Sequence, residues 1–227
     1  MKVLLVSATS SEIQTTLDFL EKHSSSKSFV EYKYKNLTVI PFVTGVGIAM
    51  TSFALGRYSE MKDITLLIHA GVSGSYSGKY NIADVVEVTS EEFADIGAEN
   101  QDRSILTTFE LGLCDINQYP FKEGRILKKN NRYETQLPKC KGLTVSYASG
   151  SEEKIQILKQ KHSAEIESME GAAVFYAARM WDVPFLSIRA ISNKVEPRNK
   201  ENWNLQAAFK SLNSSIQQII ENINPTK

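Results

Sequence analysis

Apolar residues recur along the first third of the chain in short continuous runs and in stretches with helical spacing. Residues 3–6 (VLLV) form a short run that predicts a buried strand. The capping-box sequence of residues 9–12 (TSSE) then opens an amphipathic helix that we expect to extend to about Glu21. Further on, "FVEYKYKNLTVIPFVTG" alternates apolar and polar residues on either side of Lys35 and Asn36, which predicts a hairpin.

The remainder of the chain continues to alternate strand and helix patterns. The glycines of "TGVG" precede a predicted helix at residues 48–58, and "ITLLIHAGVSGSYS" predicts a buried strand that runs into a Gly/Ser-rich turn. "DVVEVTSEEF", "GLTVSYASG" and residues 183–188 predict further strands. Helical spacing recurs in "SEEKIQILKQKH", in the segment opened by Ser168 to Gly171, and in "NLQAAFKSLNSSIQQIIENI".

This alternation predicts the fold class. Strands that alternate with helices, with some hairpin content, indicate an α/β protein: a three-layer α/β/α sandwich around a mixed, mostly parallel sheet. No composition shift or Pro/Gly/Ser-rich linker divides the 227 residues, so we expect a single domain over residues 1–227.

Charge and cysteine usage narrow the function classes. Lys+Arg and Asp+Glu both number 26, so no broad basic surface for nucleic acid is expected, and a small-molecule ligand is favoured. No apolar run approaches the length of a signal-peptide core or a membrane helix, which predicts a cytoplasmic protein without membrane contact. Cys114 and Cys140 lack CxxC spacing and the three histidines lack metal-ligand spacing, so we expect no disulfide, no metal and no cofactor.

Two glutamates at predicted helix starts each have a structural and a functional explanation. Glu12 fits the capping box, yet a carboxylate at the end of the first strand could also accept the proton of a nucleophilic water. Glu170 is favoured by the dipole of its helix, yet its two oxygens could also accept hydrogen bonds from a vicinal diol such as that of ribose. The sequence leaves both alternatives open.

Ser192 and Asn193 end a predicted strand, where ligands of α/β folds collect. A turn-forming Asn before Lys194 is the structural alternative. The glycines of "TGVG" and "AGVSGS" match neither the dinucleotide-binding nor the P-loop pattern, and they are weak signals for close approach of a ligand to the backbone.

Together these segments resemble the purine nucleoside phosphorylase and nucleosidase superfamily. The resemblance rests on "SATSSE", "TGVGIAM", "HAGVSGSY", "ESMEGAAV" and "VPFLSIRAISN", in this order over residues 3–193. Within the superfamily, "EEFADIGAEN", "TVSYASGSEE" and "SNKVEPRNKENWNL" are most similar to the futalosine hydrolases, which remove hypoxanthine from futalosine in menaquinone biosynthesis.

The resemblance implies roles for the matching positions. Glu12 would activate the hydrolytic water, Met169 and Glu170 would hold the ribose, and Ser192 and Asn193 would face the purine. The residues that would line the site near sugar and base are Gly71, Val72, Ser73 and Gly74.

Position 193 departs from the methylthioadenosine nucleosidase branch, where an Asp protonates the purine. An Asn amide can donate hydrogen bonds toward N7 and O6, which suits a 6-oxopurine such as hypoxanthine, but it cannot act as a general acid. Gly150 stands near the position where that branch places an aromatic residue, so Phe93 and Tyr147 become candidates for stacking on the base. Arg198 is a candidate for a carboxylate on the 5′ side of futalosine, against the alternative of a solvated loop arginine.

Other functions stay open at this point. Superfamily phosphorylases bind phosphate through arginines, and neither "SATSSE" nor "TGVG" contains one, so hydrolysis is favoured over phosphorolysis. The alternatives are a phosphorylase of inosine or guanosine, a methylthioadenosine/S-adenosylhomocysteine nucleosidase-like enzyme, and a nucleoside-binding protein without catalysis. The resemblance also implies a homo-oligomer, either a dimer or a tetramer.

Overall fold

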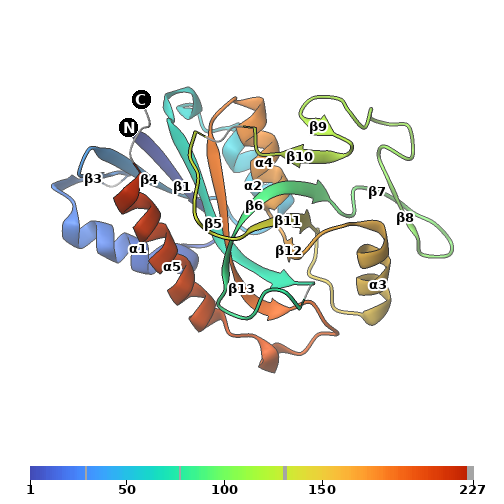
Figure 1. Ribbon diagram of the computed structural model, residues 1–227. Coiled ribbons are helices and arrows are strands. Elements are labelled where there is room, and N and C mark those ends of the chain that lie inside the picture. Colours follow the sequence, from blue (N-terminus) through green and yellow to red (C-terminus); the bar gives the residue numbers. More distant parts are fainter. Residues whose placement is uncertain (29, 77, 130–131, 224–227) are drawn as a thin grey trace.

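The computed structural model describes residues 1–28, 30–76, 78–129 and 132–223 (Figure 1). A mixed sheet of 11 strands forms its centre. One end of the sheet pairs β1 (Lys2–Ser7) in parallel with β4 (Leu37–Val43) and with β5 (Leu66–Ser75). The predicted hairpin is confirmed, because β3 (Tyr32–Tyr34) pairs antiparallel with β4 around Lys35, which has a φ of 52°. The short strand β2 (Ser26–Lys27) extends this end.

The other part of the sheet closes on itself. β5 pairs with β13 (Phe185–Lys194), β13 with β6 (Val85–Phe93), and β6 with β11 (Lys139–Thr144). β11 then pairs with β12 (Ile166–Ser168), and β12 returns to β5. The α/β class and the mixed sheet are confirmed, but the expected three-layer sandwich around a mostly parallel sheet is corrected to a barrel-like sheet. Closure is possible because β5 has 10 residues, long enough to pair with β1 near its start and with β12 at its end.

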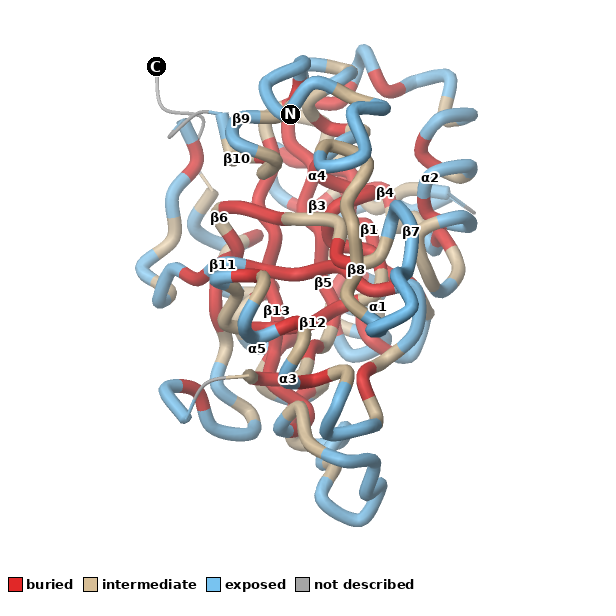
Figure 2. The backbone as a smooth tube through the Cα atoms, turned by 90° about the vertical axis from the view of Figure 1, so that its right-hand side faces the viewer, coloured by how far each residue is buried: buried red, intermediate tan, exposed pale blue. Residues whose placement is uncertain are grey.

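Helices cover both faces of this sheet. α1 (Ser10–His23) and α5 (Leu205–Asn222) lie side by side on one face, and α2 (Ile48–Gly56) contacts α4 (Gly171–Met180) on the other (Figure 1). Two clusters of buried apolar residues separate these helix pairs from the strands, and α3 (Glu152–Lys161) packs through Leu158 on a smaller third cluster. In Figure 2 the buried residues accordingly concentrate along the central strands.

The buried strand is confirmed, but β5 continues through the Gly/Ser-rich "AGVSGS" to Ser75, and the turn lies at Gly78 and Lys79. Tertiary contacts explain the glycines here: a Cβ atom on Gly71 would overlap the guanidinium of Arg189, and one on Gly74 would lie 2.7 Å from a methyl group of Val195. The absence of a side chain at Gly71 and Gly74 therefore lets β5 lie close to Arg189 on β13 and to Val195, which follows β13.

Several elements had no counterpart in the sequence-based expectations. The segment between β6 and β11 carries β9 (Phe121–Lys122), β10 (Arg125–Leu127) and a separate hairpin of β7 (Gly97–Glu99) and β8 (Ile105–Thr107). Short 3-10 helices occupy Met61–Asp63 and Lys200–Asn202. Strands of two or three residues carry too little periodicity to be recognised from sequence.

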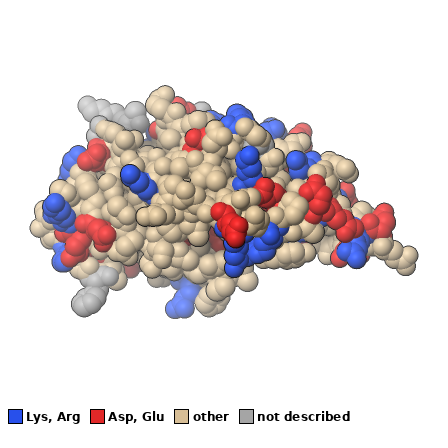
Figure 3. Space-filling view, turned by 90° about the horizontal axis from the view of Figure 1, so that it is seen from below, with Lys and Arg blue, Asp and Glu red and all other residues tan. Residues whose placement is uncertain are grey.

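The surface charge agrees with the balanced composition. In the view of Figure 3, basic and acidic side chains are scattered over a largely uncharged surface. No helix among the described residues is long and apolar enough to cross a membrane. Cytoplasmic location stays a prediction.

Candidate active site

A cavity of about 250 Å³ brings together residues from distant parts of the chain. Glu12 comes from the start of α1, Val72 to Gly74 from β5, and Met169 and Glu170 from the turn before α4. Ser192 and Asn193 enter from the end of β13. These eight residues are among those that the sequence predicted for the site. The site lies where β1, β5 and β13, which run parallel, reach their carboxyl ends.

The Glu12 side chain combines the structural role with a position at the cavity. Its Oε2 accepts a hydrogen bond from the backbone N–H of Thr9 at 2.9 Å, so the predicted capping box is confirmed. Its Oε1 faces β5, where the N–H of Val72 lies 3.3 Å away. From α5, Asn213 Nδ2 donates to the Glu12 carbonyl at 2.9 Å, which fixes the first turn of α1 against α5. The capping role therefore positions a carboxylate oxygen at the cavity instead of excluding a chemical role.

Glu170 also lines the cavity, immediately before α4. Its Oε1 accepts a hydrogen bond from the N–H of Gly47 at 2.8 Å, so the "TGVG" loop contacts the site through its backbone. Gly47 has a φ of 93°, a backbone conformation that residues other than glycine rarely adopt. Burial raises the pKa of Glu170, and the positive charge of Arg189 opposes this effect. Glu170 lines the cavity, so its carboxylate can also accept a hydrogen bond from a ligand hydroxyl.

Ser192 and Asn193 form a short hydrogen-bonded pair. Ser192 Oγ donates to Asn193 Oδ1 at 2.8 Å, and Asn193 Nδ2 donates to the carbonyl of Lys194 at 2.7 Å. Because an amide nitrogen carries two hydrogens, Asn193 keeps one donor for a ligand. These two hydrogen bonds fix the orientation of the Asn193 amide, with its oxygen Oδ1 accepting from Ser192.

Arg189 lies outside the cavity lining but acts on its carboxylates, and the sequence analysis assigned it no role. Its side chain is buried, and its Nη2 lies 2.8 Å from Nε2 of the buried His69. Burial lowers the pKa of His69 well below its ordinary value, and the charge of Arg189 lowers it further, so His69 is neutral. Arg189 therefore supplies a buried positive charge beside Glu170. A charged residue within the apolar run "FLSIRAIS" was the available sequence signal.

Three further residues of the cavity wall also escaped the sequence analysis. Trp203 and Phe209 add aromatic surface, and Glu167 accepts hydrogen bonds from Ser149 and Tyr76. They lie on segments that had been assigned only as helix, loop or strand, and nothing in their local spacing distinguishes them from core or surface residues. Their contribution depends on tertiary packing.

Three residues predicted for the site lie outside the lining of this cavity. Gly71 is covered by Arg189, and Phe93 packs against Phe121 and lines a different cavity. Arg198 is exposed and lies 5.7 Å from the ring of Trp203, with its N–H donating to the Gly150 carbonyl. Of the two candidates for base stacking, Tyr147 is 64% exposed and also lies outside the cavity lining.

Cysteine and metal-ligand geometry add nothing to this site. Cys114 and Cys140 are both free thiols. Within residues 1–28, 30–76, 78–129 and 132–223, no group of three or more His, Cys, Asp or Glu residues is arranged to hold a metal ion.

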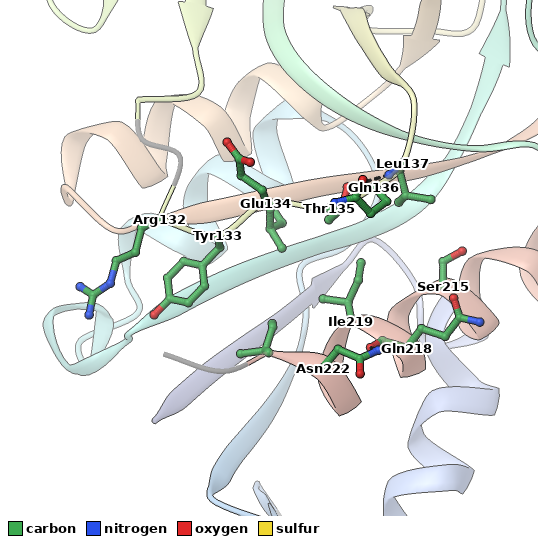
Figure 4. A pocket seen from close by; sticks show the side chains of 12 residues that line it. Arg132, Tyr133, Glu134, Thr135, Gln136, Leu137, Ser215, Gln218, Ile219 and Asn222 are labelled. Carbon is green, nitrogen blue, oxygen red and sulfur yellow. Dashed lines mark hydrogen bonds between the residues drawn. The ribbon is translucent and has the colours of Figure 1, made fainter. Parts of the chain in front are cut away.

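A larger cavity of about 410 Å³ lies elsewhere, between the segment before β11 and one side of α5 (Figure 4). Arg132, Tyr133 and Glu134 line one wall, and Gln218 and Asn222 line the other. It lacks the pair of buried carboxylates and the strand ends that distinguish the smaller cavity. We therefore assign the candidate active site to the smaller cavity.

Comparison with known proteins identifies the family of the chain. The family model described as "Phosphorylase superfamily" matches residues 2–223. A futalosine hydrolase of Thermus thermophilus is 27% identical over 180 residues, covering 78% of this chain and 79% of that protein. The futalosine hydrolase of Streptomyces coelicolor is 28% identical over 152 residues, which cover 66% of this chain and 63% of the relative, so the match spans less than two thirds of that protein.

A second group of relatives and the solved structures extend the comparison. A 5′-methylthioadenosine/S-adenosylhomocysteine nucleosidase of Maridesulfovibrio salexigens is 24% identical, covering 97% of both chains. The native structure of futalosine hydrolase from Helicobacter pylori matches with a TM-score of 0.78 and 15% identity, over 98% of each chain. The latter shows a shared fold. The resemblance to futalosine hydrolases is thus confirmed by curated relatives, and the chain belongs to the phosphorylase superfamily.

Proposed function

We propose that this protein is an N-glycosyl hydrolase that cleaves futalosine into hypoxanthine and dehypoxanthine futalosine, a step of menaquinone biosynthesis. The observation that carries the proposal is the pairing of two buried carboxylates, Glu12 and Glu170, with the amide of Asn193 around one cavity. The three curated relatives that are named futalosine hydrolases support the choice of substrate.

Each of the three side chains has a defined part in this reaction. Glu12 accepts the proton of the attacking water through its cavity-facing oxygen. Glu170 accepts hydrogen bonds from the ribose diol, and these bonds strengthen as positive charge develops on the sugar. Asn193 donates its remaining N–H to the purine and stabilises the departing base as negative charge spreads to its oxo group.

The remaining predicted residues surround these three. Val72, Ser73 and Gly74 on β5, with Met169, form the wall near sugar and base, and Ser192 orients the Asn193 amide. Trp203 joins this wall and takes the place of Phe93 as the aromatic surface nearest the cavity. Arg198, beside Trp203, remains our candidate for the carboxylate at the 5′ side.

An experiment with a panel of nucleosides tests this function. The purified protein is incubated with futalosine, aminodeoxyfutalosine, inosine and methylthioadenosine, with and without phosphate, and the products are identified by mass spectrometry. We expect free hypoxanthine from futalosine at a rate independent of phosphate. A rate that requires phosphate would indicate a phosphorylase, faster release of adenine from methylthioadenosine would indicate the other nucleosidase branch, and no released base would indicate a binding protein.

We further propose that the protein is a homo-oligomer. Apolar side chains on α2 and α4 support this: Met50 and Phe53 on α2 are 55% and 68% exposed, and Met180 on α4 is 52% exposed. Since α2 and α4 pack together, these side chains belong to one region of the surface, which a second copy of the chain would cover. Light scattering after size-exclusion chromatography measures the oligomeric state directly.

A further inference from the structure

Another buried carboxyl group lies near the candidate active site, outside the lining of its cavity, and has no part in the reaction proposed above. Glu91 on β6 is fully buried. Its Oε2 accepts a hydrogen bond from Thr144 Oγ1 at 2.9 Å, whereas its Oε1 has no hydrogen-bond partner in the described part of the chain. Burying a carboxyl group with one oxygen unsatisfied is costly, so its presence requires a physical explanation.

Two glycines make room for this carboxyl group. A Cβ atom on Gly142 of β11, or on Gly171 at the start of α4, would overlap the carboxyl atoms of Glu91. Neither glycine has a positive φ, so the reason for glycine here is space and not backbone conformation. The first turn of α4 therefore packs with its backbone directly against Glu91.

A hydrogen-bonded chain connects Glu91 to the same turn. The N–H of Ala172 donates to Thr144 Oγ1 at 2.7 Å, and the Thr144 hydroxyl donates in turn to Glu91. Because a hydroxyl group has a single hydrogen, Glu91 determines the direction in which Thr144 donates. Ala172 is two residues from Glu170, which caps α4 and lines the cavity.

We propose that Glu91 is a positioning residue for Glu170: its carboxyl group, as the acceptor for Thr144, holds the first turn of α4, and its negative charge after ionisation at higher pH weakens substrate cleavage. The inference rests on the proposed function only in the role given to Glu170. It adds a residue with no contact to the cavity, and it predicts a pH dependence that a purely structural side chain would not produce.

The charges around Glu91 support the ionisation. Burial raises the pKa of Glu91 to about 7, the positive charges of Arg189 on β13 and Arg125 on β10 oppose this rise, and Glu170 adds to it. On β11, Cys140 also faces this group, and its pKa is raised by burial and by Glu91. Ionised Glu91 places a second negative charge near Glu170 and competes with Glu170 for Arg189. Both effects disfavour the carboxylate form of Glu170 that accepts hydrogen bonds from the diol.

The decisive variant is Glu91→Gln, which preserves shape and an acceptor for Thr144 but cannot ionise. In the wild type we expect kcat/KM for futalosine to fall about tenfold between roughly pH 6 and pH 8, as one group with a pKa of about 7 loses its proton. In Glu91→Gln this decrease should be absent. A pH profile that is the same in both proteins would overturn the proposal.

Glu87→Gln provides the matched control, because Glu87 is a second buried glutamate on the same strand. Its carboxylate is paired with Lys128 and Lys139 and lies outside the cavity lining. We expect Glu87→Gln to keep the pH profile of the wild type. A Glu87→Gln profile that resembles that of Glu91→Gln would show a general effect of charge loss on β6 and would overturn the assignment.

Thermal unfolding without substrate separates this inference from the proposed function. A carboxyl group whose folded pKa is raised binds more protons in the folded state, so the wild type should lose stability as pH rises from about 5 to 8. Glu91→Gln should lose less stability over this range, because Glu170, whose pKa is also raised by burial, still contributes, and Glu87→Gln should retain the full loss. If no nucleoside is cleaved, only the proposed function is contradicted, and the unfolding profiles still decide: equal pH slopes in wild type and Glu91→Gln would overturn the inference.

Discussion

Two buried glutamates on β6, four positions apart, have opposite surroundings. Glu87 is surrounded by cations and donors: Lys128 Nζ lies 2.5 Å from Oε1, Thr135 Oγ1 donates to Oε2 at 2.6 Å, and Lys139 contacts the same oxygen. Glu91 has one hydrogen bond from Thr144 and an oxygen without a partner in the described chain. The pKa of Glu87 is lowered because these donors outweigh its burial, whereas burial prevails at Glu91 and raises its pKa to about 7.

The same difference separates the surroundings of Glu87 from those of the cavity. The buried negative charge of Glu87 is paired with two lysines, which is the arrangement expected of a carboxylate with a structural role. Around the cavity, the carboxyl groups of Glu12, Glu170 and Glu91 lie near the buried guanidinium of Arg189, and Glu167 adds a further buried carboxyl group to the cavity wall. Buried carboxylates with too few neighbouring cations lower the stability of the folded state, and they are typical of sites where charge changes during function.

The largest expected effect is on the paired glutamate. Glu87→Gln removes the partner of Lys128, whose side chain is 9% exposed, and we expect the free energy of unfolding to fall by about 3 kcal/mol. Because the folded pKa of Glu87 is lowered, its contribution is present above the ordinary carboxyl pKa and is lost as pH falls through the folded value. Urea unfolding at neutral and acidic pH measures both effects. An equal stability of the two proteins at neutral pH would show that the lysine contacts are not stabilising.

Glu12→Gln tests the cavity, where we expect this substitution to have the largest effect on catalysis. The amide can still accept from the Thr9 N–H, so the capping contact survives, but the proton acceptor for water is lost. We expect kcat for futalosine to fall at least about a hundredfold, with little change in the unfolding midpoint. Near-normal turnover would return Glu12 to a purely structural role and would remove it from the comparison.

Glu170→Gln should give a smaller loss, distributed over binding and turnover. Losing a charged acceptor for the ribose diol costs about 1.5–3 kcal/mol, so kcat/KM should fall by roughly tenfold or more, with KM raised and kcat lowered. A 2′-deoxy substrate provides the control, because it already lacks one of the two hydroxyls and should lose little further in the variant. If the variant and the deoxy substrate showed full, independent penalties, Glu170 would not bind the diol.

Asn193→Asp is expected to change preference more than rate. The wild type should cleave futalosine better than its 6-amino counterpart, because the 6-amino group meets a donor where it needs an acceptor, a mismatch of about 1–3 kcal/mol. The variant should shift the ratio of the two kcat/KM values toward the 6-amino substrate. The shift should be partial, because Ser192 Oγ continues to donate to the side-chain oxygen. A ratio that is identical in the two proteins would contradict the contact between residue 193 and the base.

Local signals made much of the helical structure predictable. The capping box at residues 9–12 and the helical spacing that follows correctly predicted α1, and the long periodic segment at the end of the chain predicted α5. The hairpin around Lys35 followed from alternation within a few residues. Such signals depend on contacts between near neighbours, which the sequence states directly.

Residues that meet at the candidate site were predictable where they stand at the end of a recognisable element or within a family motif. Glu12, Glu170 and Asn193 satisfy this condition, and the structure brings them to one cavity. Phe93 and Arg198 were inferred from their neighbourhood in the sequence, and both lie outside that cavity lining: Phe93 packs against Phe121, and Arg198 is exposed beside Trp203.

The sequence by itself determined the order of strands and helices, the local caps, and the residue types available for chemistry. Only the tertiary structure decided that the sheet closes, that Arg189 lies against Gly71, and that Gly171 makes room for Glu91. These contacts join residues some 80 to 120 positions apart, and each depends on side-chain volume and charge in a packed interior. The periodicity of the sequence does not show which distant residues will be in contact. The balance of charges at the cavity is therefore visible only in the tertiary structure.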